Sequence, residues 1–288
     1  MMTSDTARGT APTSGGSLEP TPGTAISRFF SDGYVATWRN IKKIVRVPDI
    51  LVFTLIQPIM FVLLFTFVFG SSIDIPGESY TSFLMAGIFA QTIVFGSTYS
   101  GSAMAQDLKD GIIDRFRTLP MNGSAVLIGR TVGDLVINVL SLIVMMLTGL
   151  LVGWRVESSA GSFLAGVGLL ILFAYAFSWV MSFLGLSVRS PEIINNASFL
   201  ILFPLTFISN AFVPSENLPG PLRVFAEWNP VSALVQAARV LFGNVPEGAE
   251  AADAWPLQHP VLYVLIFAVV MLVVFVPLSV RKFASLNR

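Results

Sequence analysis

A few polar side chains stand inside long apolar stretches of this chain, and they are the groups best placed to do chemistry away from water. Gln57, beside Pro58, and Gln91 each lie near the middle of one such stretch. Asp134 and Asn138 are four residues apart and so share one face of a helix. The chemistry open to amides is hydrogen bonding, either between neighbouring helices or to a molecule that passes between them. Both interpretations stay open, and Gln57, Gln91 and Asn138 are the candidate pathway residues.

Covalent, metal and nucleotide chemistry are not indicated in this chain. It has no cysteine, which excludes disulfides, thiolate metal sites and cysteine nucleophiles. Its single histidine, His259, has only carboxylates near it in sequence and cannot build a zinc site. No Gly-Lys pair occurs, so the chain cannot cradle the phosphates of ATP with a P-loop, and the G-x-S-x-G of a serine hydrolase is missing too. We therefore expect no catalytic residue, no metal site and no cofactor in this chain.

Charges are concentrated in residues 107–120, DLKDGIIDRFRTLP, where six of fourteen side chains are charged although the chain is only 12% charged overall. Four apolar residues recur at i, i+1, i+4 and i+7 and predict one stripe of a short helix: Ile112, Ile113, Phe116 and Leu119. An exposed stripe of this kind needs a surface to cover it. Mixed charges around it favour a protein partner over lipid, and packing against the protein's own helices is the alternative.

Six charge-free windows in the sequence predict the helices that position these residues. They lie at 50–73, 79–106, 135–154, 158–188, 193–215 and 254–280, and each has at least 20 residues. About 20 helical residues cross a hydrocarbon core of about 30 Å. The sequence therefore predicts an all-α integral membrane protein with six transmembrane helices, at about 50–70, 81–104, 133–153, 163–186, 194–213 and 260–280.

The orientation follows from the distribution of lysine and arginine. Fourteen of the 17 basic residues lie before the first span, after the second and fourth spans, or in the C-terminal tail. Cytoplasmic connections carry the excess of basic residues. Both termini are therefore predicted to be cytoplasmic in the cell membrane, and residues 107–120 to form a cytosolic helix between the second and third spans.

Two further segments flank the spans on the cytoplasmic side. Residues 1–25 are rich in Ser, Thr, Gly and Pro and predict a disordered tail. Residues 26–46 predict an amphipathic helix on the inner leaflet, with an aromatic, apolar face and a basic face that attracts anionic lipid. A plain juxtamembrane anchor is the alternative for that helix.

The external segment 214–253 contains a helix too short to span the membrane. Asn229-Pro230 predicts its start, with asparagine as the cap, and Gly243-Asn244 predicts its end. An apolar stripe runs between these signals: Val231, Leu234, Val235, Ala238, Leu241 and Phe242. We expect this helix to dip into the outer leaflet as a re-entrant segment or to cover the spans.

Two stretches carry a resemblance to a known family. Residues 203–244 show a pattern similar to that family's signature around the fifth span and the external loop: Phe203-Pro204, Ser209, Phe212, Pro214, Pro219 and Asn229-Pro230. Residues 107–120, followed by MNGSAVLIGR, resemble its stretch between the second and third spans. The chain from about 28 to 288 thus resembles the permeases of the type-2 ABC transporter family, particularly the short drug-exporter permeases of the daunorubicin-resistance kind.

The resemblance implies six spans with both ends inside, an interfacial N-terminal helix, a cytosolic coupling helix and re-entrant external helices. It also implies a dimer of permease chains with a separate nucleotide-binding ATPase subunit that holds ATP and magnesium. The expected partners are that ATPase, a second permease copy and membrane lipid, and not nucleic acid. The resemblance assigns the coupling contacts to Asp107, Asp110, Ile112, Ile113, Phe116, Arg117 and Leu119.

The expected function is ATP-driven export of an amphipathic drug, antibiotic or lipid-like molecule, and other functions stay open. A polysaccharide or lipid exporter of the same family is one, although the spans carry no visible continuous aromatic ladder for a sugar chain. A secondary transporter without ATPase and a non-transporting scaffold are the others. No acidic or basic residue lies mid-membrane, which disfavours ion coupling.

The predicted topology has a direct test with reporter fusions. A reporter fused after Arg288 should register as cytoplasmic, and one inserted at Glu247 should register as external. Finding both on the same side would mean that a span has been miscounted.

Overall fold

The computed structural model describes residues 48–69, 79–112, 123–188, 190–215, 218–245 and 254–286, and these ranges are almost entirely helical, without a strand. The predicted all-α class is confirmed for this part of the chain. The predicted tail 1–25 and the interfacial helix 26–46 lie outside the described residues. So do residues 113–122, which hold most of the predicted cytosolic helix.

Every predicted span corresponds to a helix or a pair of helices. The first pair is α2 (Pro48–Leu64) with a π-helical turn, η1 (Phe65–Phe69), and the second is α3 (Tyr80–Gly96) with α4 (Thr98–Lys109). The others are α6 (Gly123–Leu151), α7 (Ala160–Ser187), α8 (Pro191–Phe207) and α12 (Pro260–Leu286).

Within the described ranges, four segments are long and apolar enough to cross a membrane: Tyr80–Lys109, Leu127–Leu151, Ala160–Ser187 and Pro260–Leu286. The helices α2 and α8 have only 17 residues each. The helix α8 ends at Phe207, short of the predicted boundary, because the chain turns there toward the external segment. The structure therefore gives four candidate spans, and the six-span topology stays a prediction.

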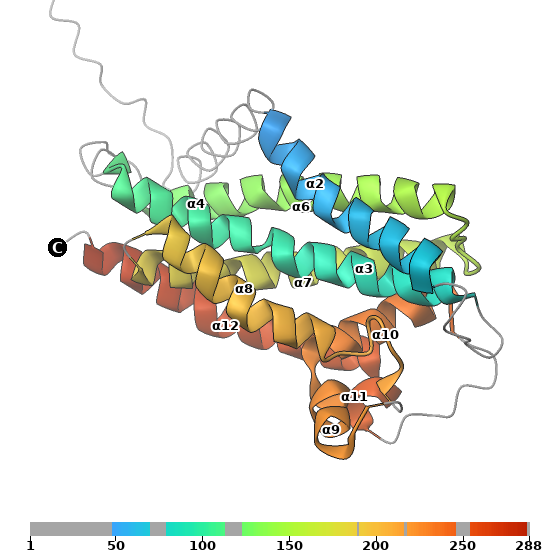
Figure 1. The fold of residues 1–288 in the computed structure, drawn as a ribbon. Coiled ribbons are helices and arrows are strands. Elements are labelled where there is room, and N and C mark those ends of the chain that lie inside the picture. The colour runs from blue at the N-terminus through green and yellow to red at the C-terminus, as the bar shows by residue number, and fades with distance from the viewer. Residues whose placement is uncertain are drawn as a thin grey trace, which may run out of the picture.

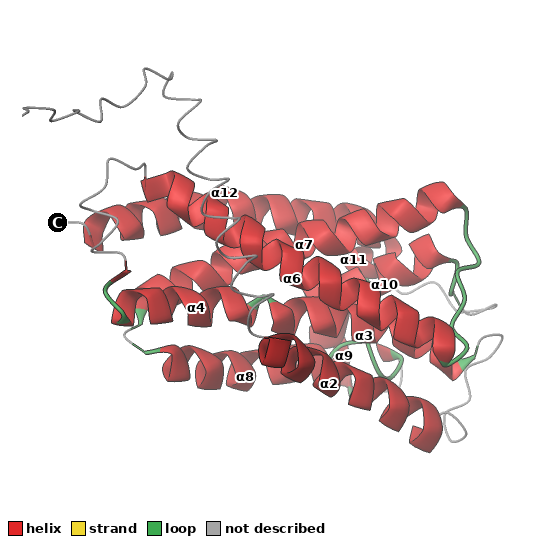
Figure 2. Ribbon diagram, turned by 90° about the horizontal axis from the view of Figure 1, so that it is seen from above, coloured by secondary structure: helices red, strands yellow, loops and turns green. Residues whose placement is uncertain are grey.

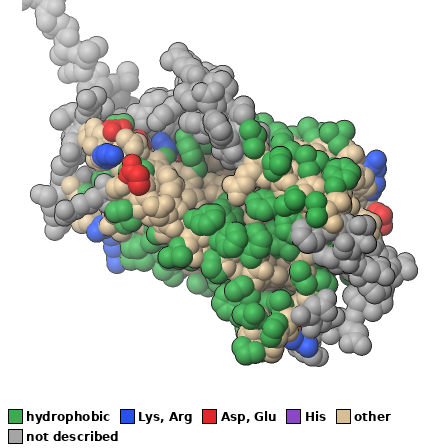
Figure 3. All heavy atoms as spheres, in the orientation of Figure 1, with side chains coloured by type: hydrophobic (Ala, Val, Ile, Leu, Met, Phe, Trp, Pro, Cys, Tyr) green, Lys and Arg blue, Asp and Glu red, His purple; other side chains and the backbone are tan. Residues whose placement is uncertain are grey.

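The helices run side by side in an elongated bundle (Figures 1 and 2). Its centre is α3, in which every residue from Ser82 to Val94 is buried. The end of α4, the start of α8 and the C-terminus lie together at one end, called here the inner end, and the α6–α7 connection lies at the opposite, outer end (Figure 1). On the face shown in Figure 3, hydrophobic side chains cover the middle and charged ones gather toward the ends.

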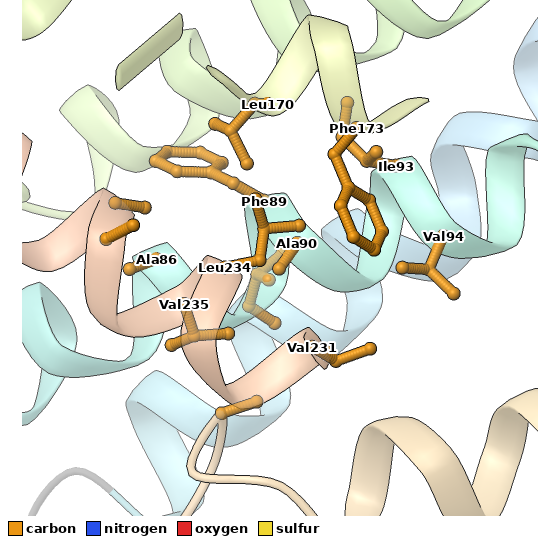
Figure 4. Close-up of a cluster of buried hydrophobic side chains, with 14 of the residues drawn as sticks. Ala86, Phe89, Ala90, Ile93, Val94, Leu170, Phe173, Val231, Leu234 and Val235 are labelled. Atoms are coloured by element: carbon orange, nitrogen blue, oxygen red, sulfur yellow. The ribbon is translucent and has the colours of Figure 1, made fainter. Parts of the chain in front are cut away.

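The core lies where α3 meets α7 and α10 (Pro230–Phe242). Phe89 of α3 lies near Leu170 of α7 and Leu234 of α10, and all three are buried (Figure 4). Lipid tails are as apolar as these side chains, so a membrane core is stabilised by close packing more than by exclusion of water.

Two glycines meet where α4 packs closely against α7. A Cβ atom added at Gly185 would lie 2.3 Å from the carbonyl oxygen of Gly101. One added at Gly101 would lie 2.7 Å from the carbonyl oxygen of Met181. The two backbones are therefore in contact, and only glycine permits this approach.

The helix α10 has the caps that the sequence predicts. The side chain of Asn229 accepts a hydrogen bond from the amide of Val231 at 2.9 Å, and Gly243 adopts the left-handed conformation with φ of 80°. The predicted stripe is buried, except that Leu241 is half-buried. The start, end and apolar face of this helix are confirmed, whereas its dipping into a leaflet stays a prediction.

Polar contacts hold α10 against the end of α8. The side-chain nitrogen of Asn229, Nδ2, donates to the carbonyl oxygens of Leu205 at 2.6 Å and Ile208 at 3.1 Å. Arg239, fully buried, donates to the carbonyl oxygens of Phe83 at 3.1 Å and Asn210 at 2.7 Å, and its guanidinium carbon lies 3.5 Å from the centre of the Phe83 ring. These two side chains, called here the polar pin, join α3, α8 and α10.

The glycine contact predicts how α7 responds to added volume. Gly185→Ala should destabilise the protein by about 1–3 kcal/mol, the usual cost of overpacking, because the new methyl group meets backbone. Thermal unfolding of the purified, detergent-solubilised protein measures this. Gly168→Ala, on the same helix, is the control, since a Cβ atom there has no neighbour within 4 Å. Equal melting temperatures for the two variants would contradict the close contact.

Candidate functional site

A cavity of about 430 Å³ lies between α2, α3, α4, α6 and α8. Its polar lining residues are Gln57, Gln91, Thr92, Thr98, Tyr99, Ser102, Asn195 and Ser198. Three phenylalanine rings, Phe61, Phe95 and Phe199, also line it. The cavity thus brings together side chains from five helices, from α2 near the start of the described chain to α8.

Two of the three candidate pathway residues line this cavity. Gln57 lies on α2 and is exposed, whereas Gln91 lies on α3 and is buried. Asn138 is placed behind the wall: it is buried, its Oδ1 atom lies over Gly96, and its side-chain nitrogen donates to the carbonyl oxygen of Asp134 at 3.4 Å. The structure therefore brings Gln57 and Gln91 into one cavity, with Asn138 in contact with the lining from outside.

A break between α3 and α4 shapes the floor of the cavity. Ser97 joins the two helices, and its hydroxyl donates to the carbonyl oxygens of Ile93 at 2.8 Å and Ala174 of α7 at 3.3 Å. The lining residues of α4 follow directly after this break. The hydroxyl of Ser102 then donates to the side-chain oxygen of Asn195, which joins α4 to α8.

The lining is suited to binding an uncharged molecule. None of the described side chains that line the cavity is acidic or basic. Amides and hydroxyls can exchange hydrogen bonds with a neutral polar group, and the phenylalanine rings can pack against an apolar one. Among the described residues, no group of three or more histidine or acidic side chains could hold a metal ion.

Charged groups gather instead below the cavity, between α4 and α6. Arg130 of α6 pairs with Asp107 of α4 at 3.3 Å and with Asp134 at 3.5 Å, and all three side chains are less than 15% exposed. The guanidinium carbon of Arg130 also lies 6.0 Å from the centre of the Tyr99 ring, which lines the cavity. This cluster, called here the charge clamp, holds the two ends of the 110–122 connection together.

The predicted coupling residues divide into two groups. Asp107 belongs to the charge clamp, and Asp110 accepts a hydrogen bond from the side chain of Gln106 at 2.7 Å. Ile112 is half-buried at the end of the described segment. The remaining coupling residues, Ile113, Phe116, Arg117 and Leu119, lie outside the described residues.

The structure also shows a file of aromatic rings that sequence reasoning missed. It leads from the cavity toward the outer end through Phe95, Phe199, Phe203, Phe207, Phe212 and Phe65, with 6.3, 5.2, 4.1, 4.8 and 4.8 Å between successive ring centres. The expectation that the spans carry no continuous aromatic ladder is therefore wrong. The signal was present in part, because phenylalanines at 199, 203 and 207 share a face of α8. The flanking rings come from other elements, which no periodicity of α8 could identify.

Comparison with known proteins gives a consistent result. The family described as ABC-2 type transporter matches residues 33–242. The chain is 32% identical over 253 residues to a daunorubicin resistance ABC transporter permease of Streptomyces coeruleorubidus, covering 87% of this chain and 85% of that relative. It is 21% identical over 227 residues to a probable doxorubicin resistance ABC transporter permease of Mycobacterium tuberculosis, covering 77% and 82%. A putative transport permease of Pyropia yezoensis is 24% identical over 213 residues, covering 72% of each chain.

Because of the charge clamp, we expect two basic residues at the inner end to differ in how much their removal destabilises the protein. Arg130→Met leaves the carboxylates of buried Asp134 and half-buried Asp107 without their cation, and breaking a buried ion pair from one side costs about 3–5 kcal/mol. Lys109→Met is the control, because Lys109 and Glu192 form an exposed pair at 3.7 Å and such pairs contribute little. Thermal unfolding of both variants in the same detergent is the measurement. An Arg130→Met protein as stable as Lys109→Met would show that the clamp does not stabilise the bundle.

Proposed function

The chain belongs to the ABC-2 type transporter family, and from this premise we propose that it is the permease subunit of an ATP-driven exporter. The ATPase is a separate subunit that binds ATP and magnesium, since this chain has no P-loop lysine. The permease works in the cell membrane, as a multi-pass protein with both termini in the cytoplasm. A second copy of the chain and the surrounding lipid complete the assembly.

The observation that carries this proposal is the uncharged cavity between the helices. Sites for small molecules are concave, largely apolar and supplied with a few polar groups that orient the ligand. The cavity has this character, with rings from α2, α3 and α8 beside amides and hydroxyls. In this proposal Gln57 and Gln91 line the pathway, and Asn138 supports its wall from behind.

The proposed substrate is an amphipathic drug, antibiotic or lipid-like molecule. The names of two relatives refer to daunorubicin and doxorubicin resistance, and this supports the drug-like choice over a polysaccharide. The lining supports it too, because none of the described side chains at the cavity is charged. An ion-coupled carrier normally has ionisable groups in its pathway, so this lining does not favour a secondary transporter.

The coupling step runs through residues 107–120. In this proposal the apolar stripe of that segment contacts a groove of the ATPase, and the charges around it fix the register. A push on the 110–122 connection reaches both of its ends through the charge clamp, because Asp107 belongs to α4 and Arg130 to α6. Both helices line the cavity, through Ser102 of α4 and Ile137 of α6. Movement of the ATPase is thereby converted into a change in the cavity wall.

The test uses the permease together with its ATPase in inside-out membrane vesicles, with ATP-dependent uptake of daunorubicin as the readout. Phe116→Asp should abolish both uptake and copurification of the ATPase while the permease stays in the membrane. A charge in an apolar stripe costs several kcal/mol when a partner must cover it. Asp114→Ala is the control and should change both readouts far less.

Each other outcome has a clear meaning. Normal uptake by the Phe116→Asp variant would show that this stripe does not couple to an ATPase. Loss of the variant from the membrane would show that the stripe packs against the permease itself. Wild-type uptake that persists without ATP or ATPase would point to a secondary transporter.

A further inference from the structure

The ring file continues from the cavity. The cavity is lined on α3 and α4 from Gln91 to Ser102. Phe95 and Phe199 belong to both the lining and the file, and the ring of Phe61, which also lines the cavity, lies 6.2 Å from that of Phe207. From Phe199 to Phe207 the file follows α8 outward over about 12 Å, at about 1.5 Å per residue. The two features together form one continuous route along the bundle.

The rings of the file differ in exposure in an ordered way. Phe199 is 54% exposed and Phe203 is 39% exposed, so their faces are open to a neighbour. Phe212, by contrast, is 4% exposed and lies stacked between Phe207 and Phe65, at 4.8 Å from each. The file is therefore open beside the cavity and closed at its outer end by three stacked rings.

We propose that the ring file is a second binding surface, along which the exported molecule moves from the cavity toward the outer end. This proposal rests on the proposed export function and adds the chemical class of the substrate. The molecule presents a flat, uncharged aromatic face, which stacks first on Phe199 and Phe203. Aromatic rings prefer offset-stacked or edge-to-face partners at 4.5–7 Å, and the spacing of the file provides such positions in succession.

The surroundings of the file select against a sugar chain. Residues 199–205 read FLILFPL and contain no polar side chain. Sugar hydroxyls that leave water for this surface would find no side-chain hydrogen-bond partner on it, and an unpaired buried polar group is costly. Phenylalanine also lacks the hydroxyl or indole N–H with which tyrosine or tryptophan could bind a hydroxyl.

The experiment measures binding to the full-length permease in lipid nanodiscs, which needs no ATPase. The probe is anthracenemethanol, a flat, uncharged and fluorescent molecule, and binding to empty nanodiscs is subtracted. Phe203→Leu should weaken the binding of anthracenemethanol about threefold to tenfold, which corresponds to the loss of one aromatic pair. Phe203→Trp should bind the probe as the wild type does. The fully hydrogenated analogue of the probe, which has no aromatic face, should bind equally to all three proteins.

Phe275→Leu is the matched control. The ring centres of Phe275 and Phe183 lie 5.8 Å apart, and neither residue lines the cavity or belongs to the file. The variant should leave binding of both probes unchanged.

Several results would overturn the proposal. One is equal binding of anthracenemethanol by Phe203→Leu and the wild type. Another is an equal loss for the hydrogenated analogue, which would mean that Phe203 acts only through packing. A third is weakened binding of maltoheptaose in place of the aromatic probe, which would assign the file to a sugar chain. All of these leave the ATP-dependent uptake test untouched, so the two proposals fail separately.

Discussion

Backbone N–H and C=O groups outside the helices must find hydrogen-bond partners within the protein, and the polar pin supplies such partners. Where lipid surrounds a protein, water cannot pair with free carbonyl oxygens, and irregular backbone is tolerated only when other groups of the protein pair with it. The chain leaves its helical path after Phe207, and the side chains of Asn229 and Arg239 donate to carbonyl oxygens on both sides of that point. Ser232 assists by accepting a hydrogen bond from the amide of Asn210 at 3.1 Å. The positions of α8, α10 and the ring file all depend on this pairing.

Charge and polarity are sorted by depth in a way that fits transport. Buried Arg130 and Asp134 lie at the inner end in the charge clamp, and buried Arg239 lies toward the outer end, where it contacts backbone carbonyls and a phenylalanine ring. Between them, the lining of the cavity offers dipoles alone. The described lining therefore offers hydrogen-bonding groups without a full charge. The buried ions pair with neighbouring helices and do not line the cavity.

The sequence predicts the features of this protein that depend on local chemistry. Caps and periodicity were enough to place the start and end of α10, because Asn229 and Gly243 act within a few residues of their own positions. The charge-free windows likewise placed the helices. They could not place the break at Ser97 or the end of α8 at Phe207, since both are fixed by contacts with distant helices. The same holds for the site: Gln57 and Gln91 were identifiable as polar residues in apolar surroundings, but that they share one cavity, and that Asn138 lies behind it, depends on how helices pack.

The two ends of α8 are attached in different ways, and this lets the helix act as a lever. Its outer end is held by the directional hydrogen bonds of the polar pin. Its inner end packs through buried Ile194 against Gly101 of α4, with a serine hydrogen bond to Asn195 and an exposed ion pair at Glu192, and packed apolar faces permit small sliding. A rod fixed at one end moves most at the other. With 17 residues and about 1.5 Å per residue, α8 is about 25 Å long, so a tilt of about 5° displaces its inner end by about 2 Å. That amplitude is enough to widen the cavity between Asn195 and Ser102 while the outer stack of rings keeps its place.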